Sequence, residues 1–384
     1  MQALRINRFN KRVLVLLILL FIIVTVFTFQ ILNYSILISS FDNKNPIQTI
    51  PRTDTTKHST KKLGLRCPVC NFTPVNPPTS TRRDVVLAAA LTQLKRVEYF
   101  LRTLRTTGTK ARIILFLDNE KTATIEWRKF FTACDIEPVF ISNPDPVVQS
   151  APKLSRYYYY QEWLSKHIDE VDRVLHTDTF DVIFQSDPFI PIITTDSLYF
   201  TFEPVTLKSS FWTEQWITQC YGKSITKKYG NRAVSCSGVT AGGAQPFLKY
   251  LNILLSTPKW VTCFGHSLDQ AHHNYLLYNG DFEKAGLNIS SFDCNSPYLT
   301  MHFCCKRAKC SWMGEGYVYG NNSNLAPVLV HQYNRWKNLT KRNPIFCPAN
   351  DDNVLSMTED EEPTNLSSLS PLTTTLPNIT FWPP

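Results

Sequence analysis

The sequence lacks charge over a long stretch near its N-terminus, where no Asp, Glu, Lys or Arg occurs between Arg12 and Asp42. Within that stretch, residues 13–32 are predominantly apolar. As a helix, this run spans roughly 30 Å, about the thickness of a bilayer core. An A-x-A-like cleavage site is also lacking, which argues against the alternative of a cleaved signal peptide. We therefore predict an uncleaved transmembrane anchor at 13–32.

The residues in front of this run are basic, with Arg5, Arg8, Lys11 and Arg12 all preceding it. Positive charge beside a spanning segment stays on the cytosolic side of the membrane. We therefore expect residues 1–12 to form a cytosolic tail and the rest of the chain to be lumenal, as in a single-pass type II membrane protein.

Glycosylation signals and cysteines agree with a secretory address. N-x-S/T sequons begin at Asn33, Asn71, Asn288, Asn321, Asn338, Asn365 and Asn378. The chain has 11 cysteines, so in an oxidising lumen we expect most to pair as disulfides and at least one to stay free. An alternative stays open for some of them, which could instead bind zinc, although their spacing is not that of a zinc-ribbon repeat: Cys67, Cys70, Cys304, Cys305 and Cys310.

A strong excess of basic charge is also lacking. The formal net charge of +9 is modest for 384 residues and lies partly in the predicted cytosolic tail. In a lumenal protein this argues against a nucleic acid as partner, and a small molecule that carries phosphate fits more readily.

Two polar segments flank a central domain. Residues 39–82 are polar and rich in Pro and Thr, which indicates a spacer, so we assign residues 33–83 to a stem. Residues 349–384 contain acidic residues but no Lys or Arg, together with many Ser, Thr and Pro, which is typical of a disordered, O-glycosylated tail. Internal repeats are absent, which excludes a repeat array. The folded lumenal domain is therefore expected to span residues 84–348.

Within this domain, apolar runs of strand length alternate with helical patterns. The runs predict buried strands at 84–91, 112–118, 137–142 and 172–178. The patterns between them predict helices from Leu94 to near Gly108, at 123–134 and at 152–168. This alternation predicts an α/β fold whose mostly parallel sheet carries helices on both faces. In such sheets, ligands bind at the carboxyl ends of the strands.

The stretch "DRVLHTDTFDVIFQSDPF", residues 172–189, places His176, Asp178 and Asp181 where a buried strand is expected to end. Buried carboxylates are costly unless a cation or a ligand satisfies them. Their hard oxygens suit Mn²⁺ or Mg²⁺, which commonly complete their coordination with substrate phosphates. The alternative is that Asp178 and Asp181 cap a turn. For Asp187 we expect a structural role, capping a helix that begins at Pro188.

The anchor, the stem and the α/β domain resemble a Golgi glycosyltransferase of the GT-A fold. Within that fold, "VLHTDTFDVIFQSDPF" resembles the metal-binding strand end of the glycogenin-like, nucleotide-diphospho-sugar transferase group, whose hallmark is Asp-x-Asp. This sequence departs from the hallmark. In an ungapped comparison Asp178 takes the second Asp position and His176 the first. Alternatively, Asp178 and Asp181 form a looser D-x-x-D pair.

The stretch "CSGVTAGG", residues 236–243, is similar to the N-S-G-V segment of the family, with Cys236 where Asn is commoner. A close approach of the backbone to a sugar or a diphosphate requires small residues. The resemblance therefore implies that Gly238, Gly242 and Gly243 bind the donor.

Two later stretches extend the resemblance. "LDQAHHNYLL", residues 268–277, is similar to the D-Q-x-x-x-N helix of the family, which implies catalytic roles for Asp269 and Gln270 and donor binding by Asn274. The alternative is an N-cap Asp followed by an ordinary polar helix face. In "LVHQYNRW", residues 329–336, His331 takes the place of a late histidine that the family uses as a metal ligand, although a lone His after a strand is more often structural.

Other residues are candidates for binding sugars or phosphate. Arg156 resembles an arginine that pairs with a phosphate or a carboxylate at the nucleotide pocket, and the alternative is a surface position. Trp212, Trp216 and Trp336 could stack on sugar rings, although Trp more often packs in a core. Glu203 could face an acceptor.

The resemblance covers roughly residues 84–348 and implies a hexosyl- or pentosyltransferase in the Golgi membrane. It would use Mn²⁺ (or Mg²⁺) to transfer a sugar from a nucleotide-sugar donor to a glycan or glycoprotein acceptor. The similarity of the D-Q helix to that of retaining enzymes favours retention. Two alternatives remain open: a non-catalytic glycan-binding membrane protein on a degenerate transferase fold, and a metal-dependent phosphoesterase, which would need a richer cluster of ligands for two metals.

Overall fold

The computed structural model describes residues 48–49, 66–91, 94, 97–118, 123–141, 151–263, 269–307, 310–313, 317–319, 326–335 and 347. All of them belong to one compact unit, Ile47–Pro384. None of the helices in this described part combines the length and the apolar character that crossing a bilayer requires. The predicted cytosolic tail, the anchor at 13–32 and the tail at 349–384 lie outside the described residues.

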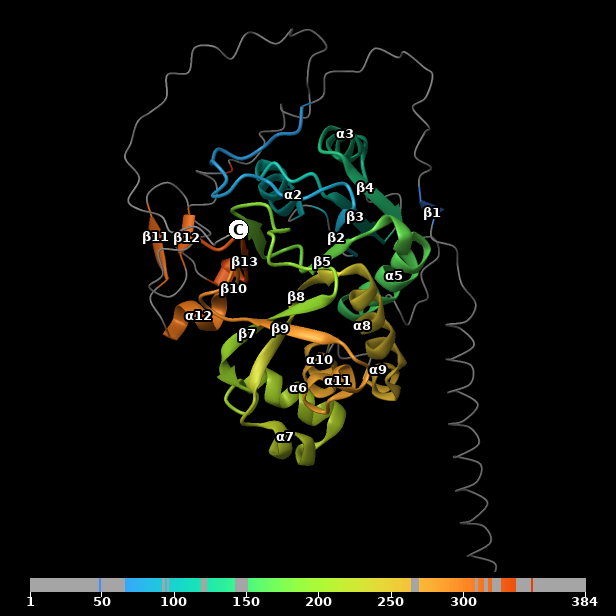
Figure 1. Cartoon of the computed structure of the whole chain (residues 1–384), viewed down its shortest axis with the longest axis vertical. Helices are drawn as coiled ribbons and strands as arrows, with labels where there is room; N and C mark the ends of the chain where they lie inside the picture. The colour runs from blue at the N-terminus through green and yellow to red at the C-terminus, as the bar shows by residue number, and fades with distance from the viewer. Residues whose placement is uncertain are drawn as a thin grey trace, which may run out of the picture. The chain divides into compact units, whose positions relative to one another are not determined.

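Strands and helices alternate along the described chain (Figure 1). The strands are β1 (Gln48–Thr49), β2 (Asp84–Ala90), β3 (Arg112–Leu117), β4 (Ile136–Phe140), β5 (Arg173–Thr177), β6 (Val182–Phe184), β7 (Ser197–Thr206), β8 (Ala233–Gly243), β9 (Asn288–Phe292), β10 (Tyr298–Thr300), β11 (Ser311–Met313), β12 (Tyr317–Tyr319) and β13 (Leu329–His331). The helices are α2 (Val97–Thr106), α3 (Ile125–Ala133), α5 (Pro152–His167), α6 (Phe211–Tyr221), α7 (Lys223–Tyr229), α8 (Ala244–Ser256), α9 (Pro258–Thr262), α10 (Asp269–Tyr278), α11 (Asp281–Lys284) and α12 (Met301–Arg307), with short 3₁₀ turns at Ile168–Glu170 and Tyr333–Arg335.

The central sheet has the strand order β1-β4-β3-β2-β5-β8-β7-β9. Strands β4, β3, β2 and β5 are parallel neighbours, and β9 is parallel to β7. Strand β8 runs antiparallel to both β5 and β7. The strands predicted at 84–91, 112–118, 137–142 and 172–178 correspond to β2, β3, β4 and β5, so the mostly parallel α/β sheet is confirmed.

Helices cover both faces of this sheet because side chains alternate along each buried strand. On one face, Val86 and Leu175 pack in a large apolar cluster with Leu104 of α2 and Phe130 of α3. On the other face, His176 contacts the rings of α5, and α5 packs against α8. The predicted helices at 123–134 and 152–168 correspond to α3 and α5, and the helix predicted from Leu94 corresponds to α2.

A second sheet, β10-β13-β6, has three strands. Strand β13 pairs parallel to β10 and antiparallel to β6, with His331 opposite Val182. Strand β6 also packs on α2, and β10 on β7. This small sheet carries the late histidine back to the end of β5.

Ten of the 11 cysteines form five disulfides, and buried Cys236 is the free one. The prediction that most cysteines pair and at least one stays free is therefore confirmed. Every cysteine of the zinc alternative is paired with another cysteine. The bridges are Cys67–Cys134, Cys70–Cys347, Cys220–Cys263, Cys294–Cys304 and Cys305–Cys310.

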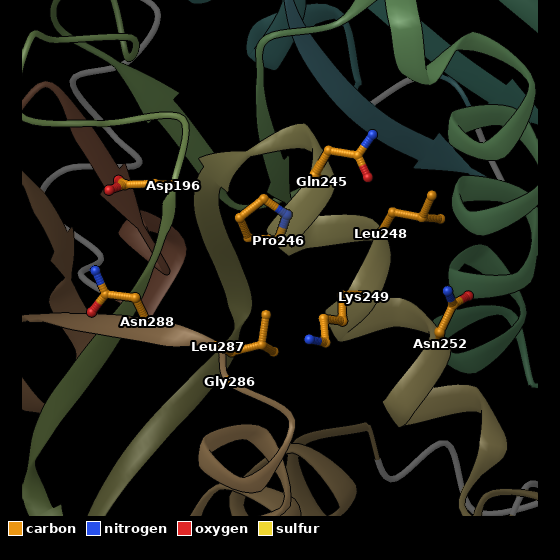
Figure 2. Close-up of a pocket in the computed structure, with 9 residues that line it drawn as sticks. All are labelled: Asp196, Gln245, Pro246, Leu248, Lys249, Asn252, Gly286, Leu287 and Asn288. Carbon is orange, nitrogen blue, oxygen red and sulfur yellow. The ribbon is translucent and has the colours of Figure 1, made fainter.

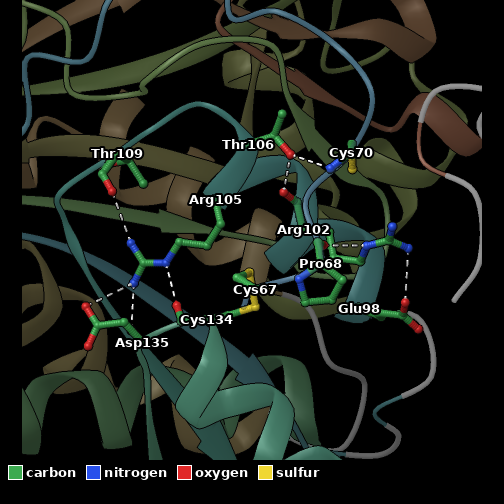
Figure 3. The surroundings of a disulfide bond; sticks show 10 residues. All are labelled: Cys67, Pro68, Cys70, Glu98, Arg102, Arg105, Thr106, Thr109, Cys134 and Asp135. Atoms are coloured by element: carbon green, nitrogen blue, oxygen red, sulfur yellow. Dashed lines mark hydrogen bonds and ion pairs between the residues drawn. A yellow bond between two sulfur atoms is a disulfide. The ribbon is translucent and has the colours of Figure 1, made fainter. Parts of the chain in front are cut away.

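The last part of the predicted stem, residues 66–83, packs on the domain. The Cys67–Cys134 disulfide ties it to the end of α3, and Arg102 Nε donates a 2.8 Å hydrogen bond to the Pro68 carbonyl (Figure 3). Asp187 Oδ2 accepts from the backbone N–H groups of Thr79 and Ser80 at 2.8 and 2.7 Å. No helix begins at Pro188 in this described stretch, so buried Asp187 is structural, as expected, but it anchors the 79–80 segment instead of capping a helix.

Candidate metal centre

The candidate site forms where β5 ends. Asp178 directly follows the last residue of β5, and its backbone N–H donates a 2.8 Å hydrogen bond to the Gly238 carbonyl of β8. Asp181 precedes β6, and β6 pairs with β13 so that His331 lies opposite Val182. The pairing of two short strands thus brings together two stretches of chain that are 153 residues apart.

The side chains of Asp178, Asp181 and His331 converge, and their ligand atoms all lie within 4.8 Å of one another. His331 Nε2 is 3.3 Å from Asp178 Oδ2 and 3.7 Å from Asp181 Oδ1. Adjacent ligands of a six-coordinate ion with bonds of about 2.1 Å lie about 3 Å apart. These residues can therefore hold a metal ion after small inward shifts.

Gly238 provides the space for this group. A Cβ atom at this position would lie 2.5 Å from His331 Cε1 and 2.8 Å from Asp178 Oδ2. Any larger residue would therefore displace the ligands. The groups that approach the backbone closely at Gly238 are the side chains of the metal-binding group, and the predicted contact of Gly238 with a sugar or a diphosphate stays a prediction.

Charge inside the group is uneven. Burial opposes the ionisation of Asp178, but Arg156 and His331 outweigh it and hold the pKa of Asp178 well below its ordinary value. Burial raises the pKa of Asp181, and the neighbouring charge of Asp178 adds to that rise. Burial also disfavours a charged His331, yet the facing Cys236, Asp181 and Asp178 raise its pKa well above the ordinary value. The group therefore attracts positive charge, as a cation site must.

Arg156 of α5 connects the metal group to α10. Its Nη1 lies 2.5 Å from Asp178 Oδ1, and its Nη2 lies 3.0 Å from Asp269 Oδ2. Tyr157 Oη also donates to Asp269, at 3.3 Å. Arg156 and Asp269 are each only 8% exposed, so the surface alternative for Arg156 does not hold. The predicted pairing of Arg156 with a carboxylate is present twice.

The remaining α10 candidates point to different partners. Gln270 is half-buried, and its Nε2 donates to Thr213 Oγ1 of α6 at 3.1 Å. Asn274 is fully buried, and its amide bonds both backbone groups of Ser235, with Nδ2 donating to the carbonyl at 2.7 Å and Oδ1 accepting from the N–H at 2.9 Å. The structure therefore gives Asn274 a positioning role, holding α10 against β8, in place of the predicted contact with the donor.

Gly242 and Gly243 lie at the far end of β8, opposite Val174 and Arg173. Gly242 lies four positions further along β8 than Gly238, a distance of roughly 13 Å. A Cβ atom at Gly242 would meet the Ser197 carbonyl oxygen at 2.2 Å, and Gly242 has a φ of 151°. The structure does not bring these two glycines to the site. They are needed instead for the close packing of β8 on the start of β7.

His176 also stays outside the group. Its side chain lies beneath the sheet against the rings of Tyr157, Tyr160 and Phe247, at centroid distances of 5.2, 5.2 and 6.3 Å. Burial and the nearby charge of Arg156 hold the pKa of His176 well below its ordinary value. Of the two pairings that the sequence allowed, the structure assembles Asp178 with Asp181. The side chain at 176 points to the opposite face from Leu175, into the aromatic layer.

Two further side chains near the group were not assigned to the metal from the sequence. Cys236 Sγ lies 3.5 Å from His331 Nδ1, on the side of the ring away from the carboxylates. Glu203 of β7 is only 4% exposed, and burial raises its pKa to about 7, an effect that His331 partly opposes. For Cys236, the available signal in the sequence was its position in the glycine-containing motif. For Glu203, the only signal was a carboxylate at the end of an apolar run.

A separate hollow of about 300 Å³ lies near the other end of β8 and contains none of the predicted site residues (Figure 2). It includes Asn288, whose Nδ2 donates to Ser197 Oγ at 2.7 Å. Asn71 and Asn288 are the sequon asparagines within the described residues, and both are exposed, as a glycosylated asparagine must be. The hollow is lined by Asp196, Gln245, Pro246, Leu248, Lys249, Asn252, Gly286, Leu287 and Asn288.

In comparison with known proteins, no family model matches the chain and no curated protein matches it significantly.

Proposed function

We propose that the protein is a metal-dependent glycosyltransferase that moves a sugar from a nucleotide-sugar donor to a glycan or glycoprotein acceptor. The observation that supports this most is the convergence of Asp178, Asp181 and His331 at the carboxyl end of β5. This end of a parallel sheet is where α/β folds bind ligands. The predicted anchor and sequons are consistent with a type II protein of the Golgi membrane.

Two carboxylates and an imidazole suit Mn²⁺, and also Mg²⁺, better than soft metals. When bound, the ion would act as a Lewis acid that neutralises charge on the leaving nucleoside diphosphate. Asp178, Asp181 and His331 would hold it, and Gly238 leaves the space that their side chains occupy.

Arg156 and α10 provide the remaining chemistry. Arg156 fixes Asp178 and Asp269 in one orientation, and its guanidinium adds positive charge beside the place where an anionic donor would lie. Asp269 and Gln270 lie in the first turn of α10, beside Arg156, where they can bond the hydroxyls of the donor sugar. Similarity of this turn to that of retaining enzymes favours retention of configuration.

Hydrolysis of donors by the full-length chain tests the proposal. A panel of nucleotide sugars would be incubated with Mn²⁺, with Mg²⁺ or with EDTA, and release of the nucleoside diphosphate measured. We expect release from one donor or a few, supported by Mn²⁺ and abolished by EDTA. Release that is indifferent to EDTA, or release of inorganic phosphate from many phosphate esters, would contradict it and support the phosphoesterase alternative.

One observation favours the second candidate, a non-catalytic glycan-binding protein. Burial of His176 in the aromatic layer leaves the site without a ligand at the first position of the familiar Asp-x-Asp pair. Such a protein would bind a nucleoside diphosphate weakly, or not at all, and would not turn over any donor. Titration with uridine and guanosine diphosphates, with and without Mn²⁺, separates the two candidates.

A further inference from the structure

Two large aromatic side chains are exposed at the start of α6. Phe211 is 68% exposed and Trp212 is 60% exposed, and they are the most exposed aromatic residues among the large exposed apolar side chains of the described chain. Their rings meet edge to face at a centroid distance of 5.1 Å, and Trp212 stacks on Trp216 at 6.3 Å. Packing of the helix does not require them, because α6 is anchored through its other face by Thr213, Ile217 and Cys220.

Polar side chains surround this aromatic edge. A shallow hollow of about 330 Å³ runs along the outer face of α6. The spacing of its lining residues is that of one helix face, and the set combines a ring, a carboxylate, two amides and a hydroxyl: Phe211, Glu214, Gln215, Thr218 and Gln219. A sugar has an apolar C–H face and a rim of hydroxyls, so a ring beside amides and a carboxylate matches both parts of it.

Helix α6 connects the aromatic edge to the candidate site through its buried face. Thr213, the residue after Trp212, accepts a 3.1 Å hydrogen bond from Gln270 Nε2. The residue before Gln270 is Asp269, which Arg156 connects to Asp178 of the metal group. Helix α6 packs against α10, and the Cys220–Cys263 disulfide fixes the end of α6 beside α9 (Figure 1).

We propose that Phe211 and Trp212, with the polar face of α6, bind the acceptor saccharide of the transfer reaction. This inference rests on the proposed function, since it assigns the second substrate to the helix that packs against α10. Adjacent exposed aromatic side chains form a contiguous apolar patch, and such patches rimmed by polar residues occur at binding surfaces. The ring would stack on the sugar, and Glu214, Gln215 and Gln219 would bond its hydroxyls.

Saturation-transfer difference NMR on the full-length chain tests the assignment. The probes are methyl β-galactoside, methyl β-glucoside, methyl α-mannoside, methyl β-xyloside and methyl β-N-acetylglucosaminide, each at millimolar concentration. We expect at least one to receive saturation from the wild type, and the double variant Phe211→Ala/Trp212→Ala to lose at least about tenfold in affinity. Trp212→Phe should retain part of the binding and Trp212→Leu should not, because only the former keeps an aromatic face. Ile125→Ala is the matched control, since Ile125 is 62% exposed on α3.

Metal-dependent donor hydrolysis, measured on the same variants, separates this inference from the proposed function. Ile125→Ala should hydrolyse the donor and bind the saccharide as the wild type does, whereas the double variant should lose the saccharide. If wild type hydrolyses a donor but binds none of the saccharides, or binds them equally after the aromatic residues are removed, the acceptor assignment is overturned and the proposed function stands. If no donor is hydrolysed with any metal, the proposed function fails. Self-association of the wild type in sedimentation that the double variant lacks would assign the surface to a second copy of the chain and also overturn the inference.

Discussion

Two buried histidines near the end of β5 belong to regions with opposite chemistry. His176 is 0% exposed and lies among the rings of Tyr157, Tyr160 and Phe247. His331 is 1% exposed and faces Asp178 and Asp181. Burial dominates around the first and depresses its pKa, whereas negative groups overcome burial around the second and raise its pKa.

The difference arises from position relative to the strand end. His176 is still inside β5, where alternation directs its side chain into the aromatic layer. Asp178 is already past the strand, so its carboxylate is free of the sheet and meets the histidine that β13 supplies. Of these two buried histidines, only His331 lies where the backbone brings carboxylates to it. Nearness in the sequence does not suffice.

The largest expected effect is at Asp178. Asp178→Asn keeps the shape of the side chain and removes the charge that holds the cation. We expect metal-dependent donor hydrolysis to fall roughly 100-fold to 1000-fold, a range typical for losing one group that stabilises developing charge. Initial rates at saturating Mn²⁺ measure the loss, and His331→Ala should act in the same direction.

Asp187→Asn is the matched control for this variant. Asp187 is a buried carboxylate nine residues further along, and it accepts hydrogen bonds from Thr79 and Ser80 at a distance from the metal group. We expect this variant to lower the melting temperature and to leave the Mn²⁺ dependence of the rate unchanged. Wild-type hydrolysis by Asp178→Asn would refute the assignment of the metal site.

His176→Asp is the direct test of the aromatic region. The substitution restores the familiar Asp-x-Asp sequence, but it places a carboxyl group in a fully buried position among aromatic rings. We expect a loss of about 3 kcal/mol in the free energy of unfolding, since burial of a carboxyl group in a mainly apolar layer costs about this much. Melting curves with and without Mn²⁺ plus nucleoside diphosphate should show the same increment as in wild type. A larger increment in the mutant would mean that position 176 reaches the ion.

Sequence patterns predicted the first half of the sheet well. Strands β2, β3, β4 and β5 are mostly buried and parallel, so they appear as largely apolar runs. The second sheet was not predicted, because β6, β10 and β13 have three residues each and no period can be seen in so few. The packing of residues 66–83 depends on disulfides and on Asp187, and neither pairing is visible from spacing.

The candidate site was predicted in part for a related reason. Motifs located Asp178, Asp181, His331, Arg156 and Asp269, which come together. They do not show which way a strand residue points when a pattern allows two registers, and so His176 remained a candidate. Nor do they show whether a glycine faces a ligand or a neighbouring strand, which decides between Gly238 and Gly242.

Low pH should destabilise the protein because two further histidines are buried, as His176 is. His272 and His273 of α10 are 0% exposed, and burial lowers the pKa of each from 6.5 to about 3. The unfolded chain therefore binds protons that the folded one refuses, so stability is complete above pH 6.5 and declines as the pH falls from 6.5 toward 3. Each histidine should cost about 1.4 kcal/mol per pH unit within that window.

Urea unfolding at pH 7.5 and pH 5.5 measures this slope. His273→Gln can keep the hydrogen bonds to Ser235 and Tyr250 without titrating, so its slope should be shallower than that of wild type. An equal slope in the two proteins would show that other groups cause the acid sensitivity.

The smallest expected effect is at Cys236, which acts on the metal group only through His331. For Nε2 to bind a cation, the ring must be neutral with its proton on Nδ1, and Cys236 Sγ lies 3.5 Å from Nδ1 as the acceptor for that proton. Cys236→Ala removes the acceptor and should weaken Mn²⁺ binding about tenfold, the lower end of such effects. Cys236→Ser retains an acceptor and should stay within a few fold of wild type. Calorimetric titration with Mn²⁺ measures both. Equal affinities for wild type and Cys236→Ala would contradict this role of Cys236. They would mean that Asp178 and Asp181 alone orient the ring of His331.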